Sequence, residues 1–177
     1  WLRAWPAAEL PRDQCRDQGI AEVPAIARQV GLKVMLGAWI GGDSANNARQ
    51  IADLIRLANA YPDVIKAVIV GNEVLLRREQ AADGLAAMLG AVKRAVPVPV
   101  TYADVWEFWL RNPQLAESVD FVTVHILPYW EDEPVGIRAA IAHVGDVLDR
   151  VRQAFPGRTL YVGEIGWPSA GRQRQGA

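Results

Sequence analysis

The feature that most constrains the fold is an alternation of short apolar runs with amphipathic stretches of helical length. The apolar runs predict five strands, at residues 32–40, 64–71, 98–103, 119–127 and 158–166. Between and before them, apolar residues recur at helical spacing, which predicts helices at about residues 23–30, 46–60, 80–95 and 135–155. Helices between consecutive strands are typical of parallel pairing through right-handed crossovers, so the pattern indicates the α/β class.

The ends of two predicted helices carry recognisable signals. Asp43 or Ser44 is expected to cap the helix at residues 46–60, because a short polar side chain can accept hydrogen bonds from free N–H groups. The helix at residues 135–155 is expected to end at Pro156-Gly157. His143 falls off its apolar stripe and is expected to be exposed. The predicted stripe consists of Ile137, Ile141, Val144, Leu148, Val151 and Phe155.

A (β/α)₈ TIM barrel fits this pattern better than a dinucleotide-binding fold. No predicted strand is followed by a glycine-rich phosphate loop of the GxGxxG or GKS/GKT kind. A complete barrel needs about 250 residues, whereas the sequence has 177 residues and a sixth strand candidate only at residues 2–5. We therefore expect one domain over residues 1–177, an incomplete barrel with five or six of the eight units and without the last strand.

Composition excludes several functional classes. The 19 basic and 20 acidic side chains leave a net charge of −1, which provides no electrostatic attraction to nucleic acid or to an anionic membrane surface. No apolar run approaches the roughly 20 residues of a membrane span. The 7 tryptophans are compatible with a carbohydrate groove, since sugar rings stack on indole, but core packing explains them equally well.

Polar and aromatic residues follow every predicted strand. In a parallel barrel the carboxyl ends of the strands meet at one rim, where catalytic groups lie. The candidate site residues, in strand order, are Trp39; Asn72 and Glu73; Tyr102 and Asp104; His125, Tyr129 and Trp130; Glu164 and Trp167.

Glu73 and Glu164 are the candidate catalytic pair. They lie 91 residues apart (164 − 73), several strands along the chain, so they can face each other across the barrel mouth. Glycoside cleavage requires two carboxyl groups, one protonated for the leaving oxygen and one ionised for the anomeric carbon. Their mutual proximity separates the two pKa values and keeps one protonated. The alternative is that each glutamate caps a helix or pairs with an arginine such as Arg77 or Arg172.

The roles of the neighbouring residues stay open at this point. Strand alternation puts His125 on the face that points into the barrel, where it could bond a sugar hydroxyl or a catalytic carboxylate, or simply be buried. Asp104 could hold a substrate hydroxyl or cap the short helical stretch that contains Trp106 and Trp109. For these two tryptophans, packing in the core or a lid is as reasonable as sugar contact.

Two of the strand ends resemble a known enzyme family. VGNEV (residues 70–74) and GEIGWPSAG (163–171) are similar to the two catalytic signatures of glycoside hydrolase family 17, the β-1,3-glucanases and related glucanosyltransferases. The strings LGAWI (36–40), NEVLLR (72–77) and HILPYW (125–130) resemble its bacterial branch. The resemblance extends from about residue 19 to the C-terminus. The paired glutamate motifs are specific to the family.

The resemblance implies a (β/α)₈ barrel that cleaves with retention of configuration. Asn72 and Glu73 match the asparagine and acid/base at the fourth barrel strand, and Glu164 matches the nucleophile at the seventh. Retention implies carboxyl groups about 5–5.5 Å apart. Tyr129, His125 and Trp167 would line the cleft, with Trp39 and Trp130 as stacking platforms.

The resemblance also implies the substrate and the setting. The substrate would be a β-1,3-glucan or a β-1,3/1,6-glucan, with no metal or organic cofactor. Bacterial relatives act in the periplasm, at the cell envelope or outside the cell, and some are fused to a membrane-bound glycosyltransferase. This segment itself is not expected to contact a membrane.

Two departures from the family pattern leave alternatives. Ile165 stands where the family usually has threonine, and the sequence ends 13 residues after Glu164 (177 − 164), so the eighth strand is expected to be missing. An open barrel exposes sheet edges. A non-catalytic glucan-binding fragment is therefore the second hypothesis. The third is a metal-dependent sugar isomerase-like barrel with Glu73, His125 and Glu164 as ligands.

Overall fold

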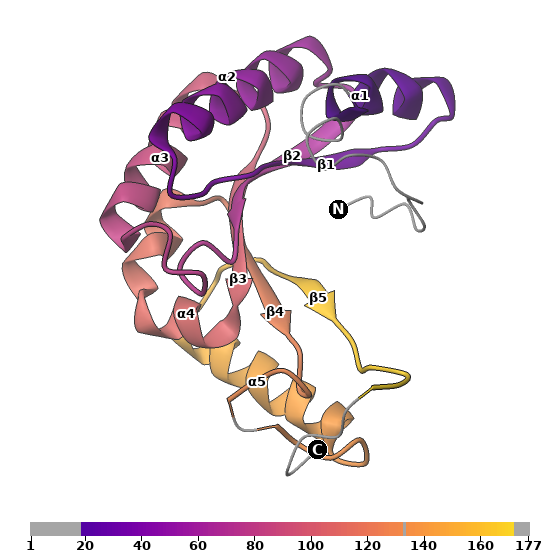
Figure 1. The fold of residues 1–177 in the computed structure, drawn as a ribbon, viewed down its shortest axis with the longest axis vertical. Helices are drawn as coiled ribbons and strands as arrows, with labels where there is room; N and C mark the ends of the chain where they lie inside the picture. The colour runs from indigo at the N-terminus through magenta and orange to yellow at the C-terminus, as the bar shows by residue number, and fades with distance from the viewer. Residues whose placement is uncertain (1–18, 133, 172–177) are drawn as a thin grey trace.

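A single curved sheet organises the molecule. The computed structural model describes residues 19–132 and 134–171. Its parallel strands, in the order β1-β2-β3-β4-β5, are β1 (Val34–Ala38), β2 (Ile65–Asn72), β3 (Val100–Val105), β4 (Val122–Ile126) and β5 (Leu160–Ile165). The sheet bends into a crescent (Figure 1), which confirms the predicted α/β class and partial (β/α)₈ barrel. The sixth strand proposed at residues 2–5 lies outside the described residues.

The helices cover the convex side of the crescent (Figure 1). Each strand lies next to the strand that precedes it in the sequence. Right-handed crossovers in this order place all the connecting helices on the same face of the sheet. Val68, Leu89 and Val124 are fully buried in the core that forms between the two layers. The helices are α1 (Gly19–Gln29), α2 (Ser44–Ala60), α3 (Ala82–Ala95), α4 (Trp106–Arg111) and α5 (Ala140–Ala154), with a 3₁₀ helix η1 (Pro113–Ser118).

Helix α2 begins as the sequence predicts. The Asp43 carboxylate accepts hydrogen bonds from the backbone N–H groups of Ala45, at 2.9 Å, and Asn46, at 3.2 Å. These groups have no partner within the helix, so the cap satisfies them.

Helix α5 starts later than predicted. The sequence places its start at residue 135, but the N–H of Val135 donates to the carbonyl of Pro128, at 3.2 Å, and the segment before Ala140 forms a loop. Ile137 of the predicted stripe therefore lies in the loop and is 59% exposed, and Ile141, in the first turn of the helix, is 82% exposed. That part of the prediction is wrong, and the buried face of the helix is made by Ala140, Val147 and Val151.

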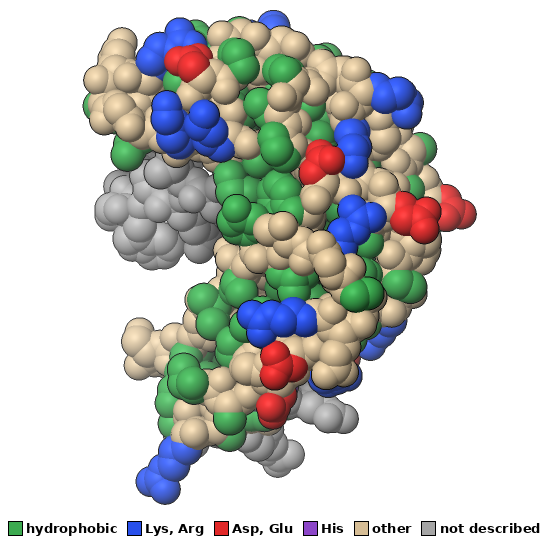
Figure 2. Space-filling model, turned by 180° about the vertical axis from the view of Figure 1, so that it is seen from behind, with side chains coloured by type: hydrophobic (Ala, Val, Ile, Leu, Met, Phe, Trp, Pro, Cys, Tyr) green, Lys and Arg blue, Asp and Glu red, His purple; other side chains and the backbone are tan. Residues whose placement is uncertain are grey.

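Apolar side chains line the open side of the crescent. In the described residues β5 pairs with β4 alone, and its Tyr161, Val162 and Ile165 are exposed. Next to β1 and α1 there is a groove of about 660 Å³ whose lining includes Ile26 and Val30. Figure 2 shows apolar side chains gathered at the hollowed side of the molecule. Of the helices in the described ranges, none combines the length and apolarity that a bilayer crossing requires.

Candidate active site

The end of β2 has an unusual backbone that lifts Glu73 above the sheet. Gly71 has φ +83°, and a Cβ at this position would lie 2.6 Å from Cγ2 of Val74, so only glycine fits. The pairing of β2 with β3 shifts register here, between Ile69 and Asn72. Glu73 itself has φ +52°, a left-handed conformation that a side chain rarely adopts outside turns and functional sites. Its N–H donates to the carbonyl of Ala103 on β3, at 2.8 Å, which holds this turn.

Tyr102 and Asp104 support the loop that follows Glu73. The Tyr102 hydroxyl accepts a hydrogen bond from the N–H of Leu75, at 3.0 Å, and donates a short one to Asp104. Both side chains are buried, and burial raises the pKa of each. The sequence analysis treated them as candidate substrate contacts. The structure places both beneath the loop, where neither is accessible to a substrate.

His125 projects from β4 between the two glutamates. It is fully buried, and its Nε2 lies 2.8 Å from Oδ1 of Asn72 and 3.9 Å from Oε1 of Glu164. Burial lowers the pKa of His125 to about 4, so the ring is neutral near neutral pH. Because Nε2 faces two oxygens, this nitrogen carries the ring hydrogen and donates to Asn72.

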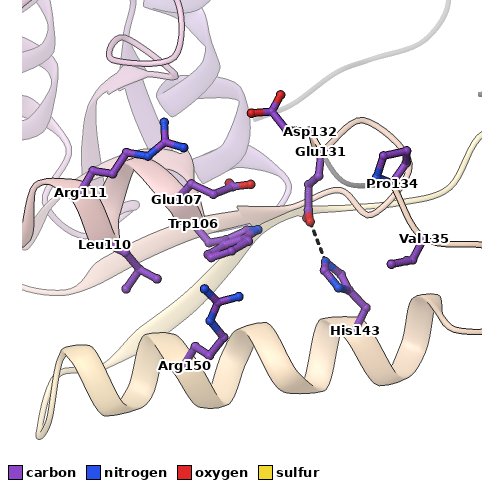
Figure 3. Close-up of a pocket in the computed structure, with 10 residues that line it drawn as sticks. All are labelled: Trp106, Glu107, Leu110, Arg111, Glu131, Asp132, Pro134, Val135, His143 and Arg150. Carbon is purple, nitrogen blue, oxygen red and sulfur yellow. Dashed lines mark hydrogen bonds and ion pairs between the residues drawn. The ribbon is translucent and has the colours of Figure 1, made fainter. Parts of the chain in front are cut away.

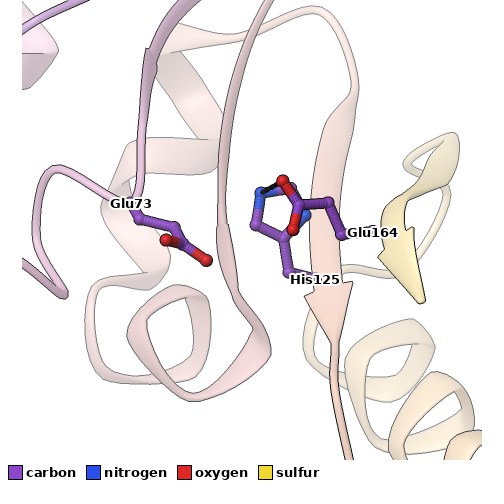
Figure 4. A group of neighbouring side chains, drawn as sticks. All are labelled: Glu73, His125 and Glu164. Carbon is purple, nitrogen blue, oxygen red and sulfur yellow. Dashed lines mark ion pairs between the residues drawn. The ribbon is translucent and has the colours of Figure 1, made fainter. Parts of the chain in front are cut away.

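Glu73 and Glu164 meet at the mouth of the crescent. One carboxylate oxygen of each and one ring nitrogen of His125 all lie within 4.8 Å of one another. Figure 4 shows the two side chains reaching toward this space from opposite sides. Burial raises the pKa of Glu73, the negative charges of Glu164 and Asp104 raise it further, and Arg77 opposes the shift. The pair can therefore hold one protonated and one ionised carboxyl group.

Three aromatic side chains lie in the loops after β4 and β5. The ring centroid of Tyr129 is 5.3 Å from that of Trp130 and 5.4 Å from that of Trp167, both nearly edge-on. Trp130 is 51% exposed. We call Tyr129, Trp130 and Trp167 the aromatic triad. It joins the loop after β4 to the loop that follows Glu164, at the same edge of the sheet as the glutamates.

The two tryptophans of α4 belong to the core. Trp106 and Trp109 are both buried, and Nε1 of Trp109 donates to the carbonyl of Thr123, at 2.9 Å. Their packing excludes stacking on a sugar in the cleft.

The cluster of Glu73, His125 and Glu164 has the ligand types of a metal site, but its hydrogen bonds fit that role poorly. A histidine ligand must present a nitrogen lone pair to the metal. The Nε2 of His125 instead donates to Asn72, and its Nδ1 is buried against Gly163.

A family model decides the assignment. The model of the BtgE/BtgC glycoside hydrolase domain matches residues 14–177. The chain belongs to this family. The predicted kinship with glycoside hydrolase family 17 is confirmed by the relatives and by a solved structure.

Three relatives show how far the similarity extends. A glucan 1,3-beta-glucosidase of Schizosaccharomyces pombe is 30% identical over 163 residues, which cover 84% of this chain and 50% of that protein. The putative glucan endo-1,3-beta-glucosidase btgC of Aspergillus niger is 28% identical over 152 residues, covering 79% of this chain and 22% of that protein. The glycoside hydrolase family 17 beta-1,3-glucanosyltransferase of Rhizomucor miehei superposes with a TM-score of 0.77 at 29% identity, over 93% of this chain and 59% of that one.

The matches cover only part of each relative's length. The chain spans between about a fifth and three fifths of the length of these relatives. All three come from fungi, so the resemblance to the bacterial branch stays a prediction.

Sequence reasoning missed the arginine that braces the site of this glycoside hydrolase domain. Arg77 was considered only as an ion-pair partner for a glutamate. It pairs with Glu79 at 2.6 Å, donates to the carbonyl of Ile40 at 2.9 Å and to that of Asn72, and lies over the ring of Trp39 at 4.4 Å. Arg77 thus ties the ends of β1 and β2 together. The string NEVLLR (72–77) contains Arg77. Its bonds to the carbonyls of Ile40 and Asn72 depend on how the ends of the two strands meet, which the string does not reveal.

Proposed function

We propose that this domain is the larger part of the catalytic barrel of a retaining glycoside hydrolase or transglycosylase that acts on β-1,3-glucan. The observation that carries the proposal is that one carboxylate oxygen of Glu73 lies within 4.8 Å of one carboxylate oxygen of Glu164. Retaining enzymes hold the two carboxyl groups about 5–5.5 Å apart, whereas inverting enzymes leave about 6.5–9.5 Å for a water molecule. The names of the fungal relatives, a 1,3-beta-glucosidase and a beta-1,3-glucanosyltransferase, support the substrate class.

The roles of the two glutamates follow from their surroundings. Glu73, whose raised pKa favours the protonated form, donates its proton to the leaving glucosyl oxygen. Glu164 attacks the anomeric carbon and forms the covalent glycosyl-enzyme intermediate. Glu73, now ionised, removes a proton from water in hydrolysis or from a sugar hydroxyl in transfer. The neutral imidazole of His125 donates its N–H to Asn72 and lies 3.9 Å from Glu164, so it orients the asparagine without neutralising the charge of the nucleophile.

Product analysis tests the proposal. The chain is incubated with β-1,3-linked gluco-oligosaccharides, and mass spectrometry compares it with the Glu164→Gln variant. We expect shorter or longer oligosaccharides from the wild type alone, and ¹H NMR should show that the first product has the β configuration. Turnover by the Glu164→Gln variant, or a first product of α configuration, would contradict the mechanism.

Glu107→Gln is a matched control. Like Glu73, Glu107 is half-buried and has a pKa raised by burial. It lines a pocket between α4 and α5, outside the barrel mouth (Figure 3). Activity should survive this substitution, because the carboxyl group is remote from the reacting atoms.

The second candidate is glucan binding without turnover. Glu164 lies on β5, whose single neighbour in the described residues is β4, and the exposed side chains of this strand leave it weakly packed. Catalysis requires the two carboxyl groups to stay within about 0.5 Å of the productive geometry. Calorimetric binding of an oligosaccharide by a folded chain that yields no products would favour this candidate. Turnover that is insensitive to chelators would eliminate the metal-dependent alternative.

The cellular setting stays a prediction from the resemblance. A location at the cell envelope or outside the cell, and fusion of the parent chain to a membrane glycosyltransferase, would be tested by fractionating cells and detecting the parent protein.

A further inference from the structure

The loop after β4 folds back on itself and presents two members of the aromatic triad. The N–H groups of Trp130 and Glu131 both donate to the carbonyl of Leu127, at 2.8 and 3.2 Å. The N–H of Val135 donates to the carbonyl of Pro128, at 3.2 Å. These bonds close a compact turn that carries Tyr129 and Trp130 at its tip.

A buried carboxylate fixes the base of this turn. Glu131 is 7% exposed, and its Oε1 accepts a hydrogen bond from the N–H of Leu127, at 3.2 Å. Its Oε2 lies 2.6 Å from Nε2 of His143 on α5 (Figure 3). A buried carboxylate is costly unless each oxygen has a partner. Both oxygens of Glu131 are used, and each one holds the loop in place: one against its own backbone, the other against a helix.

The sequence analysis expected His143 to be exposed, and that expectation is wrong. Its side chain is 21% exposed and points from α5 toward Glu131. The helical stripe could not reveal this contact, because the partner belongs to a loop rather than to the sheet.

We propose that Glu131 and His143 are positioning residues that hold the aromatic triad at the cleft and thereby set the affinity for the glucan chain. The inference rests on the proposed function. Glu131 lies within the loop that carries Tyr129 and Trp130, and Tyr129 contacts Trp167 after β5. Neither Glu131 nor His143 belongs to the group of side chains at the barrel mouth. They line the pocket of about 830 Å³ between α4 and α5.

A positioning role predicts a specific pattern of effects. Without the Glu131–His143 contact, the aromatic side chains must be ordered when the sugar binds instead of beforehand. This cost raises the dissociation constant about tenfold. The turnover number should change little, because Glu73 and Glu164 are held by β2 and β5.

The experiment measures binding in the Glu164→Gln background, which needs no turnover. A β-1,3-linked gluco-oligosaccharide is titrated into the intact chain by calorimetry. Glu131→Ala and His143→Ala should each weaken binding about tenfold, and the double variant should be no weaker than the worse single one. Glu131→Gln should stay within about threefold of the parent, because its amide oxygen can still accept from Leu127 and its NH₂ group can donate to the ring nitrogen of His143.

Asp120→Ala controls for general destabilisation. Asp120 also accepts from a backbone N–H, that of Val100 at 2.8 Å, and pairs with a basic side chain, Lys93 at 2.7 Å. These contacts lie at the start of β3, whereas the site lies at the carboxyl ends of the strands. Asp120→Ala should therefore leave sugar binding unchanged. In the active chain, Glu131→Ala should raise KM and leave kcat nearly constant, whereas partial unfolding would lower kcat and leave KM constant.

The outcomes separate the two proposals. If the Glu164→Gln parent binds and Glu131→Ala binds equally well, the positioning role is overturned and the proposed function stands. Equal weakening by Asp120→Ala overturns it as well. A folded parent that binds no oligosaccharide would contradict the proposed function, and the positioning role would fall with it.

Discussion

Gly163 on β5 lies directly against His125 on β4. A Cβ at position 163 would come within 2.8 Å of Cε1 and 2.9 Å of Nδ1 of the imidazole, and within 2.8 Å of Cγ2 of Thr123. The absence of a side chain at residue 163 therefore lets β5 approach the histidine that lies between the glutamates. The spacing of Glu73, His125 and Glu164 depends on this approach.

Gly163→Ala should consequently disturb both stability and the site. The added methyl group forces β5 or the buried His125 to move, and overpacking of this kind costs about 1–3 kcal/mol in the free energy of unfolding. Urea denaturation measures the loss. Gly145→Ala within α5 is the control, because a Cβ there meets nothing within 4 Å and alanine favours a helix. Equal stability of Gly163→Ala and the wild type would show that β5 can shift freely.

Glu73→Gln should stabilise the protein at neutral pH. The pKa of Glu73 is raised above its ordinary value of 4.5, mainly by burial, so the folded state binds this proton more tightly than the unfolded chain. The free energy of unfolding therefore falls as the pH rises from the unfolded to the folded pKa, and the loss persists above it. The neutral amide removes that loss, so the variant should be more stable at neutral pH.

The stability difference should shrink on acidification, because both side chains are neutral below about pH 4. Urea denaturation at a series of pH values follows it. Glu117→Gln on the exposed surface of η1 is the control, because it replaces a carboxyl group that folding does not bury and should leave the free energy of unfolding nearly unchanged. A gain that stays constant down to low pH would mean that the charge of Glu73 is not its source.

Tyr102→Phe should weaken the loop that follows Glu73. The hydroxyl bridges the N–H of Leu75 and the carboxyl group of Asp104, and its removal leaves both without that partner in the core. Leaving a buried polar group unsatisfied costs about 1–3 kcal/mol in the free energy of unfolding. Thermal or urea denaturation measures the loss, and turnover should fall as well, since Glu73 begins this loop.

Tyr61→Phe is the control for that substitution. Tyr61 is half-buried and uses its ring, which lies 4.6 Å from the guanidinium carbon of Arg28. Loss of its hydroxyl should change the free energy of unfolding by less than about 0.5 kcal/mol. Similar losses for the two tyrosines would show that the bond to Leu75 contributes little.

Asp43→Ala should shorten or loosen the start of α2. The carboxylate accepts from two backbone N–H groups, and loss of such a cap costs about 1 kcal/mol in the free energy of unfolding. Asp53→Ala in the same helix is the comparison, because its exposed pair with Arg56 contributes at most about 0.5 kcal/mol. If the two substitutions cost the same, the cap does not hold the helix end.

The parts of the fold that follow local rules could be predicted from the sequence. The five strands lie within a few residues of their predicted bounds, because each contains a short apolar run of strand length. Strands β2, β3 and β4 are almost wholly buried, whereas β5 is largely exposed. The cap at Asp43 depends only on neighbours in the chain. The pairing of Glu73 with Glu164 also follows from a simple rule, since parallel strand ends share one rim.

The parts set by contacts between distant segments could not be predicted. Helix α5 starts late because the N–H of Val135 is bonded to Pro128, a contact that helical periodicity does not encode. Tyr102 and Asp104 were expected at the barrel rim because they lie at the end of a predicted strand. In the structure the loop after Glu73 covers both side chains. The positive φ of Glu73 and the partner of His143 likewise arise from tertiary packing.

The strand order has a consequence for how the protein refolds. Glu73 follows β2 and Glu164 lies on β5, so three successive strand pairings, each closing a long crossover, must form before the two carboxylates meet. Parallel pairings between segments distant in the chain form slowly, whereas helices form in about a microsecond. After dilution from denaturant, circular dichroism should thus recover early, while the ability to bind or cleave sugar should return only in the slowest phase.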